Sequence, residues 1–515
     1  MQGGRARYFE NPYVSNAVQF NRLRNRVDMA SHGIQVSVLE RAVTLLEVVH
    51  NGVVDSLSAI CNPAVTVEPG VERTLGLHLY TGTLAGFAFT VDRLAQTLRR
   101  LRTPLQQEFD MGSILGKLNA FKCVFRPVLP PTNRVWTEVV PDDDSFEMAH
   151  HARQQTIDTT IDKMTSLAEQ VYGLCIAAED HLRGAHRASG HSGTRMNTFL
   201  EGDLGVRACL HAVMSKRAGS HPHRLVSEHA ERRWVQEAKA AIEVAERSGA
   251  RRHHDELLYG RAGVLYSLLY AARSGSYDNV VDDGIQSISE IILQSGRAVA
   301  RDLGSDWPLA YEFHDKQYLG AAHGLAGIVY VLLHVRLKDE RLDRDVMDVA
   351  ERCLNRMVSH LQLSTGNFPS KVYARADSRR EGDLVQWCHG APGIVPLLCR
   401  VRASESRMPA AISSALDHIW QRGLLTKGVG LCHGIAGNGY AFLHGMQFPD
   451  RRVDCLVKAV AFAEFAWDNI DALLDVPDHP LSLMEGVAGF VCFLLDLVLV
   501  LAGDRMIGFP GFDLT

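Results

Sequence analysis

Two kinds of apolar pattern alternate along the chain. In the first kind, apolar residues recur at helical spacing with polar residues between them, which predicts amphipathic helices packed against a core. These segments cover residues 36–50, 151–187, 225–248, 282–302, 342–363, 407–422 and 452–474. The second kind is a short run that is apolar on all sides, as in 487–503, and it predicts buried inner helices. Strand patterns are sparse, so we expect an all-α protein.

A short glycine motif introduces each inner run. The motif is Gly-x-x-Gly, and its first glycine stands at positions 82, 202, 260, 324, 390, 434 and 486. The first copy is stretched by one residue, from Gly82 to Gly86. Glycine is poor inside helices and suited to tight turns, so each motif is expected at the start of an inner helix. Seven repeats predict a double α/α toroid with seven inner and seven outer helices, with an open helical solenoid as the alternative.

We expect a single domain over residues 1–515, with two departures from the repeat. Residues 1–35 are polar and rich in arginine, and they are expected to form an N-terminal arm. Residues 103–150 are rich in proline and contain an aspartate run, Asp142 to Asp144. Because the spacing between the first two motifs is roughly double the others, these residues are interpreted as an insertion after the first repeat.

Composition narrows the class of protein. The chain of 515 residues is 46% hydrophobic and 22% charged with a net charge of −5, which is typical of a globular protein and gives no reason to expect a nucleic-acid partner. The start has no apolar leader, so the ten cysteines favour a reducing, cytoplasmic location. The 487–503 run is short and interrupted by Asp496, so no integral membrane segment is expected. Without coiled-coil patterns, we expect a monomer.

Two of the motifs are preceded by cysteine and histidine, since the chain reads Cys-His-Gly at 388–390 and at 432–434. If all motifs lie at one end of the toroid, then Cys388, Cys432 and His433 converge there. Two thiolates and one imidazole with one open position are the ligand set of a catalytic zinc ion. The alternative is that both cysteines are buried packing residues.

Three further residues are candidates for the same site. His389 shares the Cys-His-Gly context, but a fourth protein ligand would close a catalytic site, so a supporting or structural role is expected. His323 stands at the corresponding place in another repeat and is the candidate general acid–base, with a hydrogen-bonded core histidine as the alternative. Lys427 could bind a substrate carboxylate or steady a thiolate, or it could be an ordinary surface lysine.

Longer stretches resemble the lanthionine synthetase C-like family, in particular its eukaryotic branch. They are 256–263 (ELLYGRAG), 318–327 (YLGAAHGLAG), 366–370 (GNFPS), 387–393 (WCHGAPG), 430–437 (GLCHGIAG) and 481–489 (LSLMEGVAG), with Asn-Pro-Tyr at 11–13. The resemblance spans nearly the whole chain and implies the same seven-plus-seven toroid. It also implies zinc on Cys388, Cys432 and His433, and a family-motif histidine at His323.

The resemblance also implies an activity. Bacterial members add peptide thiols to dehydroalanine or dehydrobutyrine, and eukaryotic members look like enzymes that add glutathione to such residues in proteins. Arg7 and Lys427 look like the basic residues that contact the substrate or thiol. The expected enzyme is therefore a zinc-dependent, glutathione transferase-like protein that forms thioethers on a dehydroamino-acid-containing protein or peptide. The alternative is a glutathione-binding or signalling scaffold without catalysis; a carbohydrate-active toroid would need paired carboxylates.

The chain departs from the family pattern at three places. The first motif is stretched, residues 103–150 are inserted, and Glu201 stands where relatives often carry cysteine. The insertion lies far in sequence from the predicted metal ligands. We therefore expect it to alter access or partners rather than chemistry.

Overall fold

The computed structural model describes residues 7–29, 31–60, 78–108, 146–187, 197–215, 224–247, 254–273, 279–304, 306–335, 340–372, 384–401 and 408–514. Every named element in these ranges is a helix, and extended pairing is limited to three isolated bridges. The all-α class expected from the apolar pattern is confirmed. None of the helices within the described ranges has the length and apolar character that a membrane crossing requires.

The helices have the bounds α1 Pro12–Ser15, α2 Ala17–Met29, α3 Ser31–Ile60, α5 Thr83–Glu108, α7 Phe146–Arg187, α8 Asp203–Ser215, α9 Arg224–Arg247, α10 Arg261–Ala272, α11 Asn279–Asp302, α12 Leu325–Leu332, α13 Glu340–Leu361, α14 Ala391–Arg400, α15 Met408–Arg422, α16 Ile435–Gly445, α17 Arg452–Asp468, α18 Ile470–Leu474 and α19 Val487–Leu501.

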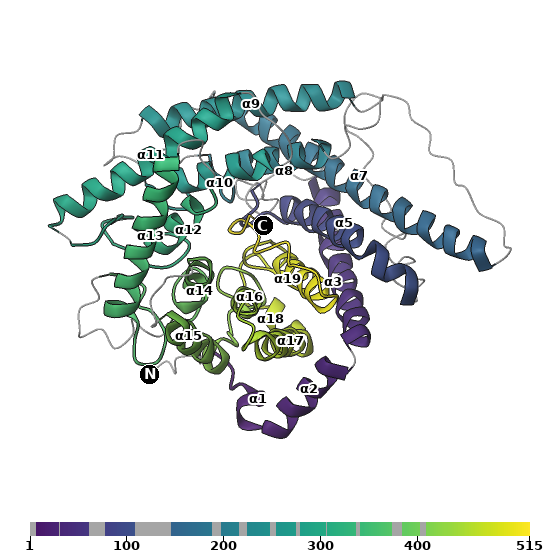
Figure 1. Cartoon of the computed structure of the whole chain (residues 1–515). Coiled ribbons are helices and arrows are strands. Elements are labelled where there is room, and N and C mark those ends of the chain that lie inside the picture. The colour runs from purple at the N-terminus through teal and green to yellow at the C-terminus, as the bar shows by residue number, and fades with distance from the viewer. Residues whose placement is uncertain are drawn as a thin grey trace.

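An inner ring is formed by α5, α8, α10, α12, α14, α16 and α19. Each of these helices begins at the residue after the first glycine of a motif, as predicted. Each packs on the next along the chain, and α19 packs on α5, so the ring is closed (Figure 1). Helices α3, α7, α9, α11, α13, α15 and α17 form the outer layer. The double α/α toroid is therefore confirmed over the described residues, and the open solenoid is excluded by the α19–α5 contact.

Burial explains why the inner helices are apolar on all sides. Every residue of α19 except Val500 is buried, including Asp496, and all residues of α12 are buried. Fully burying a large apolar side chain stabilises the fold by about 1.5–3 kcal/mol, so such a helix is held by its position rather than by an amphipathic face. The outer helices α11 and α13 each bury only part of their residues and leave the others partly or fully exposed.

Close backbone packing explains the second glycine of the motif. A Cβ atom on Gly327 would lie 1.8 Å from the carbonyl oxygen of Ala321, and one on Gly437 would lie 1.9 Å from that of Leu431. In both cases the chain folds back so that a carbonyl six residues earlier covers the helix start. The stretched first copy differs, because a Cβ on Gly86 would lie 3.1 Å from its nearest atom, the backbone nitrogen of Leu483.

The two expected departures from the repeat are described only in part. Residues 7–11 are extended, but the rest of the predicted arm is helical, with α1, α2 and the start of α3 before residue 35. At the insertion, α5 continues to Glu108 and α7 begins at Phe146, so both ends of the 103–150 segment are helical. Residues 109–145 lie outside the described residues, and the single-domain assignment stays a prediction.

The C-terminal segment lies near the centre of the ring (Figure 1), and it contacts α12 and α16 towards the ends where these helices finish. Asp513 accepts hydrogen bonds from Tyr330 on α12 and from the backbone N–H of Phe509, and it pairs with His444 on α16 at 3.0 Å. Burial alone would raise the pKa of the Asp513 carboxyl, but His444 and these donors lower it well below its usual range. The segment therefore joins several inner helices through one buried charge.

Candidate metal centre

A series of backbone hydrogen bonds aligns five of the turns that precede the inner helices. The bonds form an open chain through five of the seven motifs, and they join the residues two places before the first glycine. The N–H of Cys388 donates to Cys432 at 3.1 Å, Cys432 to Met484 at 2.7 Å, Met484 to Tyr80 at 3.1 Å, and Tyr80 to Leu200 at 2.9 Å. Because equivalent residues are bonded to one another, equivalent side chains from distant parts of the sequence lie at the same end of the toroid.

The residue directly before the first glycine is partly exposed in every repeat. We call this set the pre-glycine residues: Thr81, Glu201, Tyr259, His323, His389, His433 and Glu485. The glycine that follows each of them is buried. The pre-glycine residues are therefore partly open to solvent, whereas the glycines beside them are covered.

The structure brings Cys388, Cys432 and His433 together. Their possible ligand atoms all lie within 4.8 Å of one another. Both cysteines are buried, and His433 is partly exposed. Cys388 donates to the Gln386 Oε1 atom at 3.2 Å, and Cys432 accepts a hydrogen bond from the Tyr80 hydroxyl at 2.9 Å. The hydrogen bond with Cys388, together with burial, raises the pKa of the Cys432 thiol well above its usual range.

This cluster fits a metal ion by donor type and by distance. Two sulfur atoms and one nitrogen are a typical zinc ligand set, and tetrahedral zinc with ordinary bond lengths separates two thiolates by about 3.7 Å. The observed spread of up to 4.8 Å requires only a small contraction. A bound cation would also reverse the electrostatics at the thiols, because it stabilises the deprotonated form that burial disfavours. The three residues therefore form a possible metal site.

His323 is held by a carboxylate that sequence reasoning did not single out. Its Nδ1 atom lies 2.8 Å from Glu256 Oε2, and Glu256 is buried. The same carboxylate accepts the backbone N–H groups of Leu258 and Tyr259, which fixes its orientation. Phe313 stacks flat on the imidazole, with ring centroids 4.3 Å apart and planes 6° apart. Because Glu256 contacts Nδ1, Nε2 is the ring nitrogen of His323 that is available to a substrate. Glu256 opens the 256–263 stretch, so its motif was visible, but its role was not.

His389 lies between the Cys388–Cys432–His433 cluster and His323. Its ring centroid is 6.4 Å from that of His323, and it precedes the first glycine of the repeat next to His433. Burial, followed by the nearby charges of His323 and Lys371, lowers the pKa of His389 to about 4. Within the described ranges its buried Nδ1 atom has no hydrogen-bond partner. It is absent from the cluster of possible metal ligands there, and its supporting role stays a prediction.

The N-terminal arm brings Arg7 beside the loop that carries Lys427. Tyr8 forms an antiparallel bridge with Leu425, and the N–H of Thr426 donates to the carbonyl of Arg7 at 3.2 Å. Both basic side chains are exposed. Lys427 is close enough to contribute to lowering the pKa of His389. The two basic residues therefore stand on adjacent segments, with Lys427 near the candidate metal centre.

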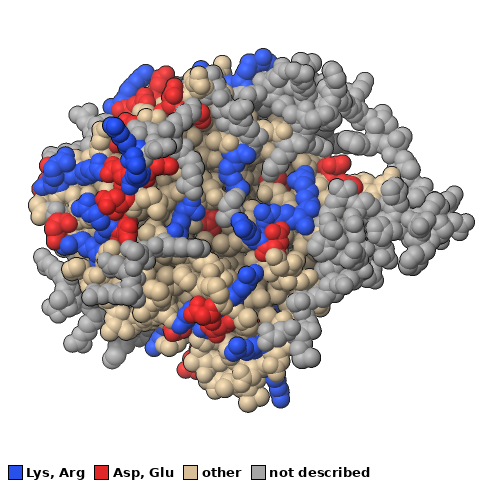
Figure 2. Space-filling view, viewed as in Figure 1, with Lys and Arg blue, Asp and Glu red and all other residues tan. Residues whose placement is uncertain are grey.

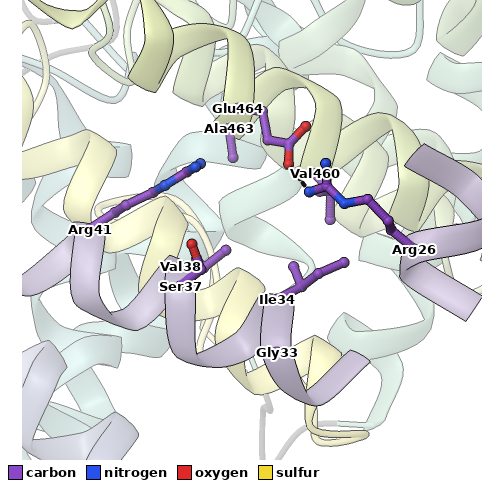
Figure 3. Close-up of a pocket in the computed structure, with 9 residues that line it drawn as sticks. All are labelled: Arg26, Gly33, Ile34, Ser37, Val38, Arg41, Val460, Ala463 and Glu464. Atoms are coloured by element: carbon purple, nitrogen blue, oxygen red, sulfur yellow. Dashed lines mark hydrogen bonds and ion pairs between the residues drawn. The ribbon is translucent and has the colours of Figure 1, made fainter. Parts of the chain in front are cut away.

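A cavity of about 230 Å³ lies elsewhere, between α2, α3 and α17 (Figure 3). Arg26, Arg41 and Glu464 surround its apolar floor. Arg26 forms an ion pair with Glu464, and the guanidinium of Arg41 lies 5.2 Å from the ring centre of Trp467. This cavity shares no residue with the candidate metal centre. On the face of the molecule in Figure 2, acidic and basic side chains are interspersed, in keeping with the small net charge.

The fold and the site together define a helical toroid with a two-cysteine, one-histidine cluster at the start of its inner helices. Residues 176–500 match the model of the lanthionine synthetase C-like protein family. The chain belongs to this family, as its resemblance predicted.

Two relatives come from eukaryotes. Glutathione S-transferase LANCL1 of Danio rerio is 36% identical over 309 residues, covering 59% of this chain and 72% of the relative. LanC-like protein GCL1 of Arabidopsis thaliana is 35% identical over 333 residues, covering 62% and 71%. The solved structure of nisin cyclase is 16% identical with a TM-score of 0.45, over 83% of this chain and 90% of that one, and it adds nothing to the assignment.

Proposed function

We propose that this protein adds a thiol, glutathione or a related compound, to dehydroalanine or dehydrobutyrine residues in proteins or peptides, forming a thioether. The carrying observation is that the Cys388–Cys432–His433 cluster and the Glu256–His323 pair open on the same end of the toroid. Family membership and the likeness to a relative named as a glutathione S-transferase support a glutathione-related role. The cytoplasmic location and the monomeric state stay predictions.

Cys388, Cys432 and His433 would hold a zinc ion, which supplies a Lewis acid that lowers the pKa of a reacting thiol. The two protein sulfurs partly offset the charge of the ion, so an added sulfur keeps its nucleophilic character. Lys427, near this centre, and Arg7, on the adjacent segment, carry exposed positive charge and would bind the carboxylates of glutathione.

His323 is the proposed proton donor. The sulfur of the thiol forms a bond to the β-carbon of the dehydroamino acid, and the π electrons of the double bond move towards the α-carbon and its carbonyl. His323, protonated on Nε2, gives its proton to the α-carbon. Glu256 holds the ring through Nδ1 and stabilises the protonated imidazole before the transfer. The proton released by the next thiol restores the histidine, so the net reaction is addition of the thiol across the double bond.

The test combines metal analysis with an addition assay. Purified protein, glutathione and a dehydroalanine peptide are incubated, and the mass of the peptide is measured by mass spectrometry. We expect one zinc ion per chain and a mass gain of one glutathione, with both lost in Cys432→Ala. The matched control is Cys399→Ala, which removes another buried cysteine, located in the last turn of α14 and away from the start of the helix. Zinc and glutathione binding without any addition would instead support the scaffold role.

A further inference from the structure

Tyr80 contacts the candidate metal centre from the other side of the ring closure. Its hydroxyl donates to the Sγ atom of Cys432 at 2.9 Å, although the two residues are 352 positions apart. Tyr80 belongs to the turn of the stretched first motif, which sequence reasoning connected with no function. The contact is made to a sulfur that the proposed function assigns to the metal.

The backbone explains how the phenol reaches this sulfur. Tyr80 stands two residues before the first glycine of its motif, as Cys432 and Met484 do in theirs. Backbone hydrogen bonds join Met484 to Tyr80 on one side and to Cys432 on the other. Tyr80 and Cys432 are thus separated by one turn, and only a long side chain spans that separation. Since the backbone of Tyr80 is bonded on both its N–H and its carbonyl, the starting point of the phenol is fixed.

A phenol is suited to this place because it donates one hydrogen bond and stays neutral near pH 7. Hydrogen bonds to metal ligands orient those ligands and tune the metal. A donor to a thiolate also draws electron density away from the sulfur, so the sulfur gives less charge to a bound ion. That matters most in a site rich in sulfur, where a reacting thiol would bring a third sulfur to the ion.

We propose that Tyr80 is a positioning residue for the metal centre: its hydroxyl orients the Cys432 sulfur and limits the charge that this sulfur passes to the metal, so that the reacting thiol is deprotonated at a lower pH. This inference rests on the proposed function for its metal and its reaction. Its direct readouts, however, are properties of the metal site that need no catalysis.

The test removes one hydroxyl with Tyr80→Phe. In protein loaded with Co²⁺, we expect the sulfur-to-metal charge-transfer band to move to lower energy, because a sulfur without its donor is easier to oxidise. Zinc affinity, measured by competition with a chelating dye, should fall about 10-fold, because the loss of the donor that orients the Cys432 sulfur outweighs the stronger charge donation. The pH midpoint of glutathione addition should rise. The matched control is Tyr266→Phe, which removes a buried hydroxyl that donates to the carbonyl of Asp513 at the opposite end.

A second variant guards against a folding defect in Tyr80→Phe. Replacing Tyr80 by 3-fluorotyrosine keeps the shape and strengthens the donor, so the charge-transfer band should move to higher energy. Bands and zinc affinities equal to those of the unmodified protein in both variants would overturn the inference. Shifted bands in a protein that shows no addition would support the inference for the metal site and contradict the proposed reaction. A protein that binds neither Co²⁺ nor Zn²⁺ would overturn both.

Discussion

The two ends of the toroid are built from the same inner helices, yet they treat polar groups in opposite ways. At the end closed by the C-terminal segment, Asp496 and Asp513 are buried, and each carboxylate is surrounded by donors. At the end where the inner helices begin, the pre-glycine residues are partly exposed, and the buried Nδ1 of His389 has no partner among the described residues. The end closed by the C-terminal segment therefore stabilises the fold, whereas the end where the inner helices begin leaves polar groups partly exposed.

The largest expected effect is at the open end. His323→Asn should retain zinc while the rate of glutathione addition falls about 10²–10⁴-fold, the usual contribution of a general acid. Its melting temperature should change little, since His323 is partly exposed and makes one side-chain hydrogen bond to Glu256. Single-turnover mass spectrometry measures the rate, and His360→Asn, on the exposed face of α13, is the control. An unchanged rate would remove His323 from the mechanism.

The closed end should respond in stability rather than in rate. Asp513→Ala removes the buried carboxylate that accepts from Tyr330 and contacts His444, and it leaves both side chains facing an apolar gap. Leaving buried polar groups without their partner costs about 1–3 kcal/mol each in the free energy of unfolding. Urea denaturation measures the loss in the free energy of unfolding. At low urea, the folded variant should still bind zinc. If the variant lost zinc while keeping its stability, the two ends would not be separate in function.

The glycine motif affects both stability and zinc binding, so we expect its substitution to have an intermediate effect. Gly437→Ala places a Cβ atom against the carbonyl of Leu431, next to Cys432, and should cost about 1–3 kcal/mol while lowering zinc affinity. Gly86→Ala, in the stretched motif, has more room and should cost less. Urea denaturation and zinc titration of the pair give both quantities. Equal losses in the two variants would contradict the packing account of the motif.

The smallest expected effect is the pH dependence of stability that His211 contributes. Burial lowers the pKa of His211 on α8 to about 4, below the usual value of 6.5. The unfolded chain therefore binds this proton more readily, so the stability contributed by the neutral imidazole is complete above pH 6.5 and is lost as the pH falls towards 4. Between pH 7 and 5 we expect His211 to account for a loss of about 1–2 kcal/mol. Denaturation of His211→Gln should show a shallower decline with acid, whereas the exposed His360→Gln should match the unmodified protein.

Sequence predicted most of the fold because the repeat is a local signal. A turn that tolerates only glycine is visible in the chain itself, because a Cβ atom on Gly327 or Gly437 would clash with a carbonyl only six residues away. The convergence of Cys388 with Cys432 then follows from the closed ring. The sequence could not indicate which outer segments are helical near the N-terminus, because α1 and α2 are short or polar and are held by contacts with α15 and α17.

The parts of the site that sequence missed depend on long-range hydrogen bonds. Tyr80 meets Cys432 across the ring closure, and Glu256 meets His323 from the neighbouring turn. Neither pair has a characteristic spacing, because the number of residues between two turns depends on outer helices and loops of variable length. The C-terminal segment was missed for the same reason, since its partners Tyr330 and His444 lie in two different inner helices.

The contact between α5 and α19 has a consequence for how the protein is made. A chain that emerges from the ribosome in order can build its helix pairs one after another, but the ring cannot close until α19 has left the exit tunnel. Cys432 would then already be present without the Tyr80 contact and without the Met484 turn beside it. The candidate metal centre therefore gains its Tyr80 contact only once the ring closes, and a chain that lacks α19 would carry these thiols in an open, unfinished ring.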